Sequence, residues 1–338
     1  MAEGVSRRSL LAQATALCGL VAAPALARPP RPLFLGDFSP LIAGIEAPEG
    51  IAVDAGGALV FSGDGAVFRL GPDGRSAELA RPVAPNGLAL GVDGQILVAN
   101  MGRLKGLPGP LQRIDLASDH VETLVGELDG RKLTSTNDLA VARDGRVYCT
   151  HTGWGPVGNI GSPASDGFVY CRWPDGRAEV VARGLRSPNG IRLDAAGRHL
   201  YVSITAEARI LRWPVLSDGR LGKAERFGPS LGETDPAHTV AALRELAGSQ
   251  RAGLGYCDGI NFDADGNLWI TLPLANRIVV LTPAGRLVPI IHDPAGWLID
   301  FPTNLCWSGP DMRQLNVVSR KGGAIVAALT ARPGLRLL

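Results

Sequence analysis

The chain has 338 residues, of which 44 are Gly and 25 are Pro, while 46% are hydrophobic and 20% are charged. This many helix-breaking residues exclude a coiled coil or a long helical bundle, and the apolar fraction excludes a disordered chain. The 34 Lys and Arg residues nearly balance the 32 Asp and Glu residues and form no long basic run, so we expect no nucleic-acid partner. The composition predicts short strands separated by turns.

Residues 1–27 have the pattern of an export signal. Arg7-Arg8 precede a weakly apolar run, and Ala25-Leu26-Ala27 supplies a small-residue cleavage site. Paired arginines before such a run resemble a bacterial twin-arginine signal peptide. We therefore expect a periplasmic mature domain of residues 28–338, free of the membrane, with the export machinery as a transient partner. An N-terminal membrane anchor is the alternative.

The mature domain keeps four cysteines, whose spacing matches no zinc motif. They are Cys149, Cys171, Cys257 and Cys306. An oxidising compartment permits disulfides, and four cysteines allow three pairings. Buried free thiols are the alternative, and the sequence leaves the choice open.

Six segments repeat one order: a polar residue, a short apolar strand, a turn seven residues after the polar residue, and a second strand. The polar residues stand at positions 49, 86, 137, 189, 258 and 304, and five of the six turns contain Gly. Third and fourth strands follow in most units, as in the apolar segment 277–281. Units of this length are typical of propeller blades. We predict an all-β, six-bladed β-propeller with four-stranded antiparallel blades in one domain; a β-sandwich is the alternative.

Two further segments complete the predicted propeller. The interval between positions 189 and 258 holds one short helical insertion, with Asp235 and Pro236 expected at its start and Gly248 at its end. Residues 28–44 precede the first blade and are expected to pair with the last one. Such pairing closes the ring and removes two exposed sheet edges.

The repeat phase predicts a polar ring inside the propeller. The first strand of each blade lines the central axis, so residues at one phase converge at one end of the channel. These residues are Glu49, Asn86, Asn137, Asn189, Asp258 and Asn304. Two carboxylates and several amide oxygens suit a hard divalent cation such as Ca²⁺, Mg²⁺ or Mn²⁺. The alternative is that an Asn or Asp that precedes Gly, as at positions 86, 189 and 258, is only a left-handed turn residue.

The second strands return to the same end of the channel as the ring. Their ends bring Asn100, His151 and Trp154 to the mouth, where they and the ring residues Asn86 and Asn304 are candidates for substrate contacts. His151 is also a candidate general base, since the ordinary pKa of histidine is near neutral. The sequence contains no Gly-x-Ser-x-Gly elbow, P-loop or dinucleotide fingerprint.

Five motifs together resemble the regucalcin/gluconolactonase family. They are Pro48-Glu49-Gly50, Ser135-Thr136-Asn137-Asp138, Ser187-Pro188-Asn189-Gly190, Cys257-Asp258-Gly259 and Phe301-Pro302-Thr303-Asn304. The resemblance implies a six-bladed propeller that holds one divalent cation and, in the family's enzymes, hydrolyses lactones. It further implies that Glu49, Asn189 and Asp258 are the metal ligands and that Asn137 contacts substrate. Ca²⁺ is the first expectation for the metal, with Zn²⁺, Mn²⁺, Mg²⁺ and Fe²⁺ as alternatives.

The chain departs from the family pattern at two places. Ser135 stands where sugar lactonases of the family have an arginine, and Thr150-His151-Thr152 stands where many read Thr-Asp-Pro. We therefore expect a lactone or related cyclic ester that is less polyhydroxylated than gluconolactone.

The expected activity is that of a metal-dependent carboxylic-ester hydrolase. The cation would stabilise the oxyanion that forms when water attacks the ester carbonyl. The candidates for the base are Asp258, His151 and a metal-bound hydroxide. A propeller enzyme that resembles strictosidine synthase, or a non-catalytic protein that binds a metal or small molecule, are the alternative functions.

Overall fold

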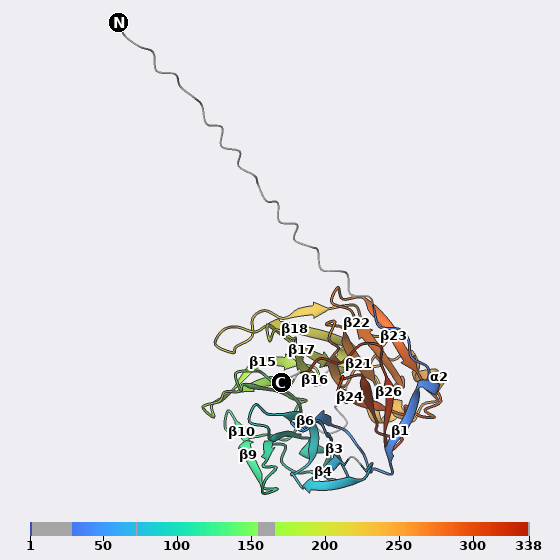
Figure 1. Cartoon of the computed structure of the whole chain (residues 1–338), viewed down its shortest axis with the longest axis horizontal. Coiled ribbons are helices and arrows are strands. Elements are labelled where there is room, and N and C mark those ends of the chain that lie inside the picture. The colour runs from blue at the N-terminus through green and yellow to red at the C-terminus, as the bar shows by residue number, and fades with distance from the viewer. Residues whose placement is uncertain (2–28, 72, 155–165, 337–338) are drawn as a thin grey trace.

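The computed structural model of the chain describes residues 1, 29–71, 73–154 and 166–336. In these residues, six four-stranded sheets surround a central axis (Figure 1). The predicted six-bladed propeller with four-stranded antiparallel blades is confirmed. The predicted signal peptide lies outside the described residues except for Met1, so export stays a prediction. No described helix is long and apolar enough to cross a membrane.

The first three blades contain twelve strands in chain order. Blade one consists of β2 (Ile51–Val53), β3 (Leu59–Gly63), β4 (Ala66–Leu70) and β5 (Ser76–Ala80). Blade two consists of β6 (Pro85–Leu90), β7 (Ile96–Asn100), β8 (Leu111–Ile114) and β9 (Val121–Val125). Blade three consists of β12 (Thr136–Val141), β13 (Val147–His151), β14 (Gly167–Arg172) and β15 (Ala178–Leu185). A small hairpin of β10 (Glu127–Leu128) and β11 (Arg131–Lys132) connects blades two and three.

The last three blades follow the same plan, but blade six takes a strand from the N-terminal part of the chain. Blade four consists of β16 (Pro188–Leu193), β17 (His199–Ile204), β18 (Arg209–Pro214) and β19 (Glu225–Phe227). Blade five consists of β20 (Ile260–Phe262), β21 (Leu268–Leu272), β22 (Arg277–Leu281) and β23 (Leu287–His292). Blade six consists of β24 (Pro302–Ser308), β25 (Gln314–Ser319), β26 (Ala324–Leu329) and β1 (Phe38–Ala43).

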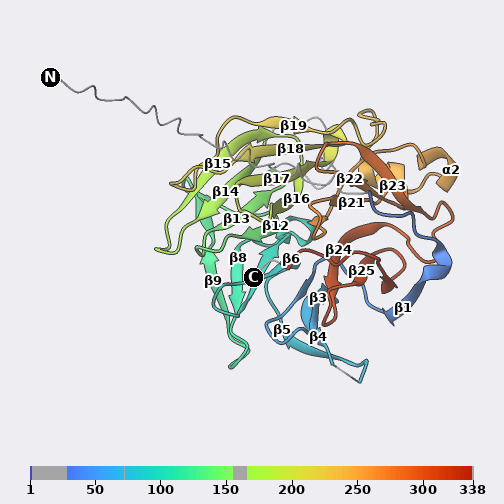
Figure 2. The ribbon, with the colours of Figure 1, turned by 45° about the horizontal axis from the view of Figure 1, so that its top comes forward.

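The ring closes through β1, as predicted for residues 28–44. This strand pairs antiparallel with β26, from Phe38 opposite Ala328 to Ala43 opposite Ala324. Figure 2 shows β1 beside the blade that contains β24 and β25. Closure removes the two open edges that a linear array of blades would leave.

The predicted turns between first and second strands adopt left-handed backbone conformations. Gly57, Gly94 and Gly145 have φ angles of 85°, 79° and 84° at these turns. Gly fits there because it lacks a Cβ, and in blade six Met312 takes the same place with φ 55°. The repeated Gly in the sequence therefore marks real hairpins.

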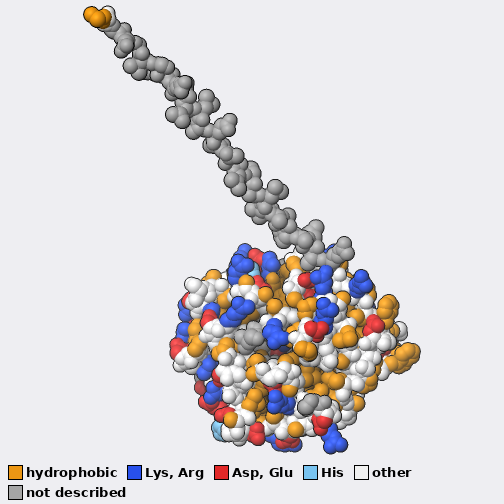
Figure 3. All heavy atoms as spheres, in the orientation of Figure 1, with side chains coloured by type: hydrophobic (Ala, Val, Ile, Leu, Met, Phe, Trp, Pro, Cys, Tyr) orange, Lys and Arg blue, Asp and Glu red, His pale blue; other side chains and the backbone are white. Residues whose placement is uncertain are grey.

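The apolar core lies between neighbouring blades. Trp269 of blade five and Trp307 of blade six meet edge to face with ring centroids 5.2 Å apart. Phe38 of the closing strand belongs to the same buried cluster. On the outer face shown in Figure 3, Lys and Arg side chains are interspersed with Asp and Glu side chains.

The predicted helical insertion consists of two short helices, α1 (Val240–Arg244) and α2 (Gly248–Arg251). Thr239 caps α1 by accepting a hydrogen bond from the backbone N–H of Ala242. Asp235 is not the cap, because its carboxylate accepts from Ala237 N and contacts His238. Gly248 starts α2 instead of ending a helix. Three 3₁₀ helices are also described: η1 (Leu35–Asp37), η2 (Gly102–Lys105) and η4 (Thr205–Glu207).

Four cysteines are buried free thiols: Cys149, Cys171, Cys257 and Cys306. This decides between the two alternatives that the sequence left open. Burial raises the pKa of Cys171, Cys257 and Cys306 to about 12, so these thiols stay protonated and unreactive at neutral pH.

Candidate functional site

The six ring residues sit at the starts of the inner strands or immediately before them. Four of them, Asn86, Asn137, Asn189 and Asn304, lie within β6, β12, β16 and β24 and are at most 7% exposed. Asn86 donates to the backbone carbonyl and side-chain oxygen of Asn137 at 3.0 and 3.2 Å. Asn137 in turn donates to the hydroxyl of Thr152 at 2.9 Å. The ring amides therefore belong to a hydrogen-bonded network.

The Gly that follows a ring residue is required by close approach of neighbouring inner strands. A Cβ on Gly190 would lie 2.5 Å from the carbonyl oxygen of Asp258, and a Cβ on Gly259 would lie 2.5 Å from that of Thr303. Neither Gly has a positive φ. The alternative interpretation of these dipeptides as left-handed turns is therefore wrong.

Hydroxyl groups on the second strands hold the backbone of the ring. Thr150 donates to the carbonyl of Asn189 at 2.6 Å, and Ser203 donates to that of Asp258 at 2.6 Å. Ser62 does the same for Asn86 at 2.7 Å. Each bond runs from one blade to the first strand of the next. The sequence prediction missed these residues, although a Ser or Thr recurs at one place in the second strand.

Two largely buried carboxylates face each other in the ring. The side chain of Glu49 is 15% exposed. Burial raises the pKa of Asp258 well above its usual value, and the negative charge of Glu49 adds to this effect. Burial also raises the pKa of Glu49, although Arg320 opposes the shift. No Lys or Arg among the described residues pairs with Asp258. The two carboxylates of Glu49 and Asp258 thus have one arginine, Arg320, between them, and a second positive charge is lacking.

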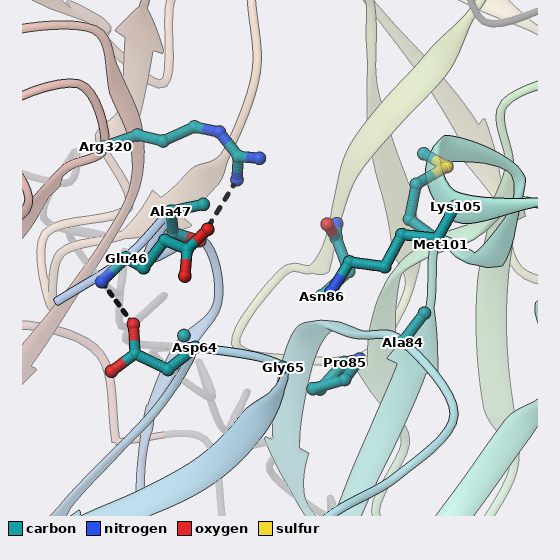
Figure 4. Close-up of a pocket in the computed structure, with 11 residues that line it drawn as sticks. Glu46, Ala47, Asp64, Gly65, Ala84, Pro85, Asn86, Met101, Lys105 and Arg320 are labelled. Atoms are coloured by element: carbon teal, nitrogen blue, oxygen red, sulfur yellow. Dashed lines mark hydrogen bonds between the residues drawn. The ribbon is translucent and has the colours of Figure 1, made fainter.

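Arg320 is a site residue that sequence reasoning missed. It follows β25, its side chain is 24% exposed, and its guanidinium forms an ion pair with Glu49. It also lines a pocket of about 170 Å³ at the channel mouth, opposite Asn86 and Lys105 (Figure 4). The repeat gave no signal for it, since only the sixth blade has an arginine at this place.

His151 lies apart from the ring, in a buried aromatic cluster. It is 0% exposed, and its Nε2 accepts from the backbone N–H of Thr134 and Ser135 at 3.3 and 3.1 Å. Its ring stacks on Phe168 at a centroid distance of 4.4 Å and contacts Trp154 at 4.2 Å. Burial, and then the nearby arginines, lower its pKa to about 3. His151 is therefore neutral at physiological pH.

Trp154 and Asn100 also have packing partners away from the ring. The guanidinium of Arg131 lies 4.0 Å above the ring of Trp154. Asn100 is fully buried, accepts from Ala84 N at 2.7 Å and donates to Pro110 O at 3.0 Å. Substrate contacts by these two residues stay a prediction. Residues 155–165, which follow Trp154, lie outside the described residues.

A cationic side chain, that of Arg103, lies close to Ser135. Its hydroxyl donates to the carbonyl of Gly153 at 2.9 Å, and Arg103 donates to the same carbonyl at 2.6 Å. An arginine from another loop therefore lies next to the place where the family pattern has its own. The sequence signal for Arg103 was absent because it precedes Ser135 by more than thirty residues.

Residues 47–321 match the family model described as the SMP-30/Gluconolactonase/LRE-like region. The chain belongs to this family. The predicted resemblance to regucalcin and gluconolactonase is confirmed.

Three members or neighbours of the SMP-30/gluconolactonase family illustrate the likeness. A gluconolactonase of Zymomonas mobilis is 27% identical over 219 residues, which cover 64% of this chain and 56% of that protein. A 6-deoxy-6-sulfogluconolactonase of Pseudomonas putida is 26% identical over 258 residues, 76% of each chain. The calcium-binding regucalcin of Agrobacterium tumefaciens shares the fold with a TM-score of 0.67, at 19% identity, over 88% of this chain and 96% of its own.

The donor set of this family member fits a hard divalent cation. The described residues contain no cluster of three His, Cys, Asp or Glu side chains arranged for a metal. The candidate set instead combines the carboxylates of Glu49 and Asp258 with the amide oxygen of Asn189, and oxygen ligands of this kind favour Ca²⁺ or Mg²⁺. The missing positive charge beside Asp258 is the structural reason to expect a cation here.

Arg320→Met is expected to tighten cation binding by about tenfold, because the guanidinium competes for Glu49 and repels a cation. The same change should lower the melting temperature of the metal-free protein, since Glu49 would then face Asp258 without compensation. Calorimetric titration with Ca²⁺ and melting in chelator measure both effects. Lys105→Met, on the far side of the pocket, is the control. Weaker Ca²⁺ binding by Arg320→Met would show that Arg320 supports the site.

His151 should make the fold acid-sensitive. Its folded pKa of about 3 lies below the ordinary value near 6.5, so the unfolded chain binds the extra proton and stability falls as pH drops from about 6.5 towards 3. His151→Gln keeps an acceptor for the two backbone N–H groups and should flatten this slope in urea unfolding measured from pH 7 to pH 4. The exposed His120→Gln is the control and should leave the slope unchanged.

Proposed function

We propose that the chain is a divalent-cation-dependent lactonase whose reaction takes place above the polar ring. The observation that carries this proposal is the convergence of Glu49, Asn189 and Asp258 in a chain of the SMP-30/gluconolactonase family. None of the three lines the mouth pocket, but Arg320, which pairs with Glu49, does. The named activities of the two sequence relatives support it. The match spans only 56% of the Zymomonas protein, so lactonase activity of this chain is itself part of the proposal.

Glu49, Asn189 and Asp258 would hold the cation. When bound, the cation polarises the lactone carbonyl and favours negative charge on its oxygen. Asp258 is the base in this proposal: its carboxylate takes a proton from the attacking water and returns it to the alkoxide when the ring C–O bond breaks. His151 is a poorer base, since its Nε2 lone pair already accepts from two backbone N–H groups.

The mouth sets the substrate class. A pocket of about 170 Å³ is smaller than the roughly 300–1,000 Å³ of drug-sized sites, which favours a compact ring. Asn86 borders this pocket and, through Asn137, orients a polar group on the substrate. We propose a small lactone with few hydroxyl groups, because the hydroxyl of Ser135 and the Nη1 of Arg103 both already donate to the carbonyl of Gly153.

The test measures hydrolysis of a panel of lactones in a pH-stat, which records the acid released. Each lactone is assayed with added Ca²⁺, Mg²⁺, Mn²⁺ or Zn²⁺ and with excess chelator. The panel includes gluconolactone, γ-butyrolactone, δ-valerolactone and γ-caprolactone. We expect turnover that chelator abolishes and that one cation restores, with the less hydroxylated lactones preferred. Turnover that chelator leaves unchanged contradicts cation dependence, and a preference for gluconolactone contradicts the substrate class alone.

A further inference from the structure

A second cavity lies at the opposite end of the channel from the ring. It has a volume of about 520 Å³ and shares no lining residue with the mouth pocket. Its walls come from the far ends of the first strands of all six blades, together with Leu335 and Arg336. This volume falls within the range of roughly 300–1,000 Å³ typical of small-molecule sites.

The walls of this far-end cavity are mostly apolar. Three residues after the ring position, blades one, two and three have Ala52, Ala89 and Ala140, and all three line the cavity. Blades four and five have Arg192 and Asn261 at the same phase. The small side chains of blades one to three thus leave space on one side of the axis, and the polar side chains of blades four and five border this space on the other side.

Arg192 is a buried guanidinium with three of its five N–H groups unused. Its side chain is 5% exposed, and its Nη1 donates to Asp138 at 2.8 Å and to the carbonyls of Leu139 and Ile191 at 3.1 and 2.6 Å. Its Nε and Nη2 donate to no described residue. Burial of unpaired donors is costly, and Nε is buried too deeply to reach a ligand, whereas Nη2 keeps accessible surface and can donate a charge-assisted hydrogen bond to a carboxylate.

The other polar groups of the cavity favour an anion over a cation. Asn261 donates to Leu305 O at 3.3 Å and accepts from Phe262 N at 2.9 Å. The carboxylate of Asp54 pairs with Arg69 at 2.7 Å. Arg336 is exposed at the cavity and pairs with no carboxylate among the described residues. The groups left to a ligand are therefore the unused Nη2 donor of Arg192, whose charge Asp138 already balances, and the positive charge of Arg336.

We propose that the far-end cavity binds a small carboxylate with an apolar body. The carboxylate accepts from Nη2 of Arg192, and the apolar body packs against Ala52, Ala89 and Ala140. The site is separate from the ring, and its occupancy does not depend on lactone hydrolysis.

Calorimetric titration of the full chain with decanoate tests the proposal, with decan-1-ol as the matched neutral ligand. We expect one decanoate per chain and an affinity at least about tenfold higher than that of decan-1-ol, the effect of a charge-assisted hydrogen bond. Failure to bind decanoate, or equal affinity for the two ligands, overturns the proposal without any variant.

Two variants locate the ligand. Ala89→Leu with Ala140→Leu fills the cavity and should weaken decanoate binding by at least about tenfold, while Ca²⁺ binding at the ring stays unchanged. Arg192→Met is combined with Asp138→Asn so that no carboxylate is left unpaired, and this pair should reduce decanoate affinity to that of decan-1-ol. Full decanoate binding by both variants places the ligand elsewhere and contradicts the proposal.

Discussion

Asp258→Asn is expected to lower kcat on the best lactone by about a thousandfold, even when the cation is saturating, because general bases typically contribute a factor of about 10²–10⁴. The asparagine keeps the size of the side chain and one oxygen donor, so the fold should persist while cation affinity falls. The measurement is steady-state kinetics at rising cation concentration until the rate no longer changes. The loss should lie in kcat and not only in KM.

The control is Asp265→Asn, which changes an aspartate of the same blade at the far-end turn, where it pairs with Arg332. This variant should retain full turnover. If Asp258→Asn keeps more than about a tenth of kcat at saturating cation, Asp258 is not the base. A matching loss in His151→Gln, with an altered acid limb of the pH–rate profile, would assign the base to His151 instead.

Gly190→Ala is expected to lower the free energy of unfolding by about 3 kcal/mol or more. Its new Cβ would meet the carbonyl oxygen of Asp258, which belongs to the neighbouring inner strand and cannot swing away as a flexible side chain could. Separation of the two strands would also spread Asn189 and Asp258, so cation binding should fall together with stability. Denaturant unfolding and calorimetry measure the two losses.

Gly253→Ala is the matched control, since the nearest heavy atom to its Cβ would be Glu233 Oε2 at 3.8 Å. It should change the unfolding free energy by less than about 1 kcal/mol. A similarly small effect for Gly190→Ala would mean that the inner strands adjust easily, and that the Gly after each ring residue is not needed for close approach.

The repeat made the ring predictable from sequence. A fixed phase places one residue per blade at one end of the channel, so Glu49, Asn189 and Asp258 could be brought together before any coordinates were known. The closing strand could be predicted too, because an open array leaves two sheet edges to cover. These inferences needed only periodicity and the physics of strand pairing.

Other parts of the site carry no repeat signal. Arg320 occurs at its place in one blade only, and Arg103 reaches Gly153 from a different loop. The position of His151 at the end of β13 predicts a mouth residue, yet its side chain packs in an aromatic cluster. Periodicity fixes where a Cα lies; the direction and partners of a long side chain depend on packing between segments far apart in sequence.

The pairing of β1 with β26 has a consequence for the order of folding. Phe38 lies opposite Ala328, so this contact closes a loop that contains most of the 338 residues. Such long-range pairing costs loop-closure entropy and slows folding. Blade six, which carries Asn304 and leads directly to Arg320, cannot complete its sheet until synthesis has passed residue 329. We therefore expect a nascent chain on the ribosome to form the early blades first and to assemble the ring site only after release.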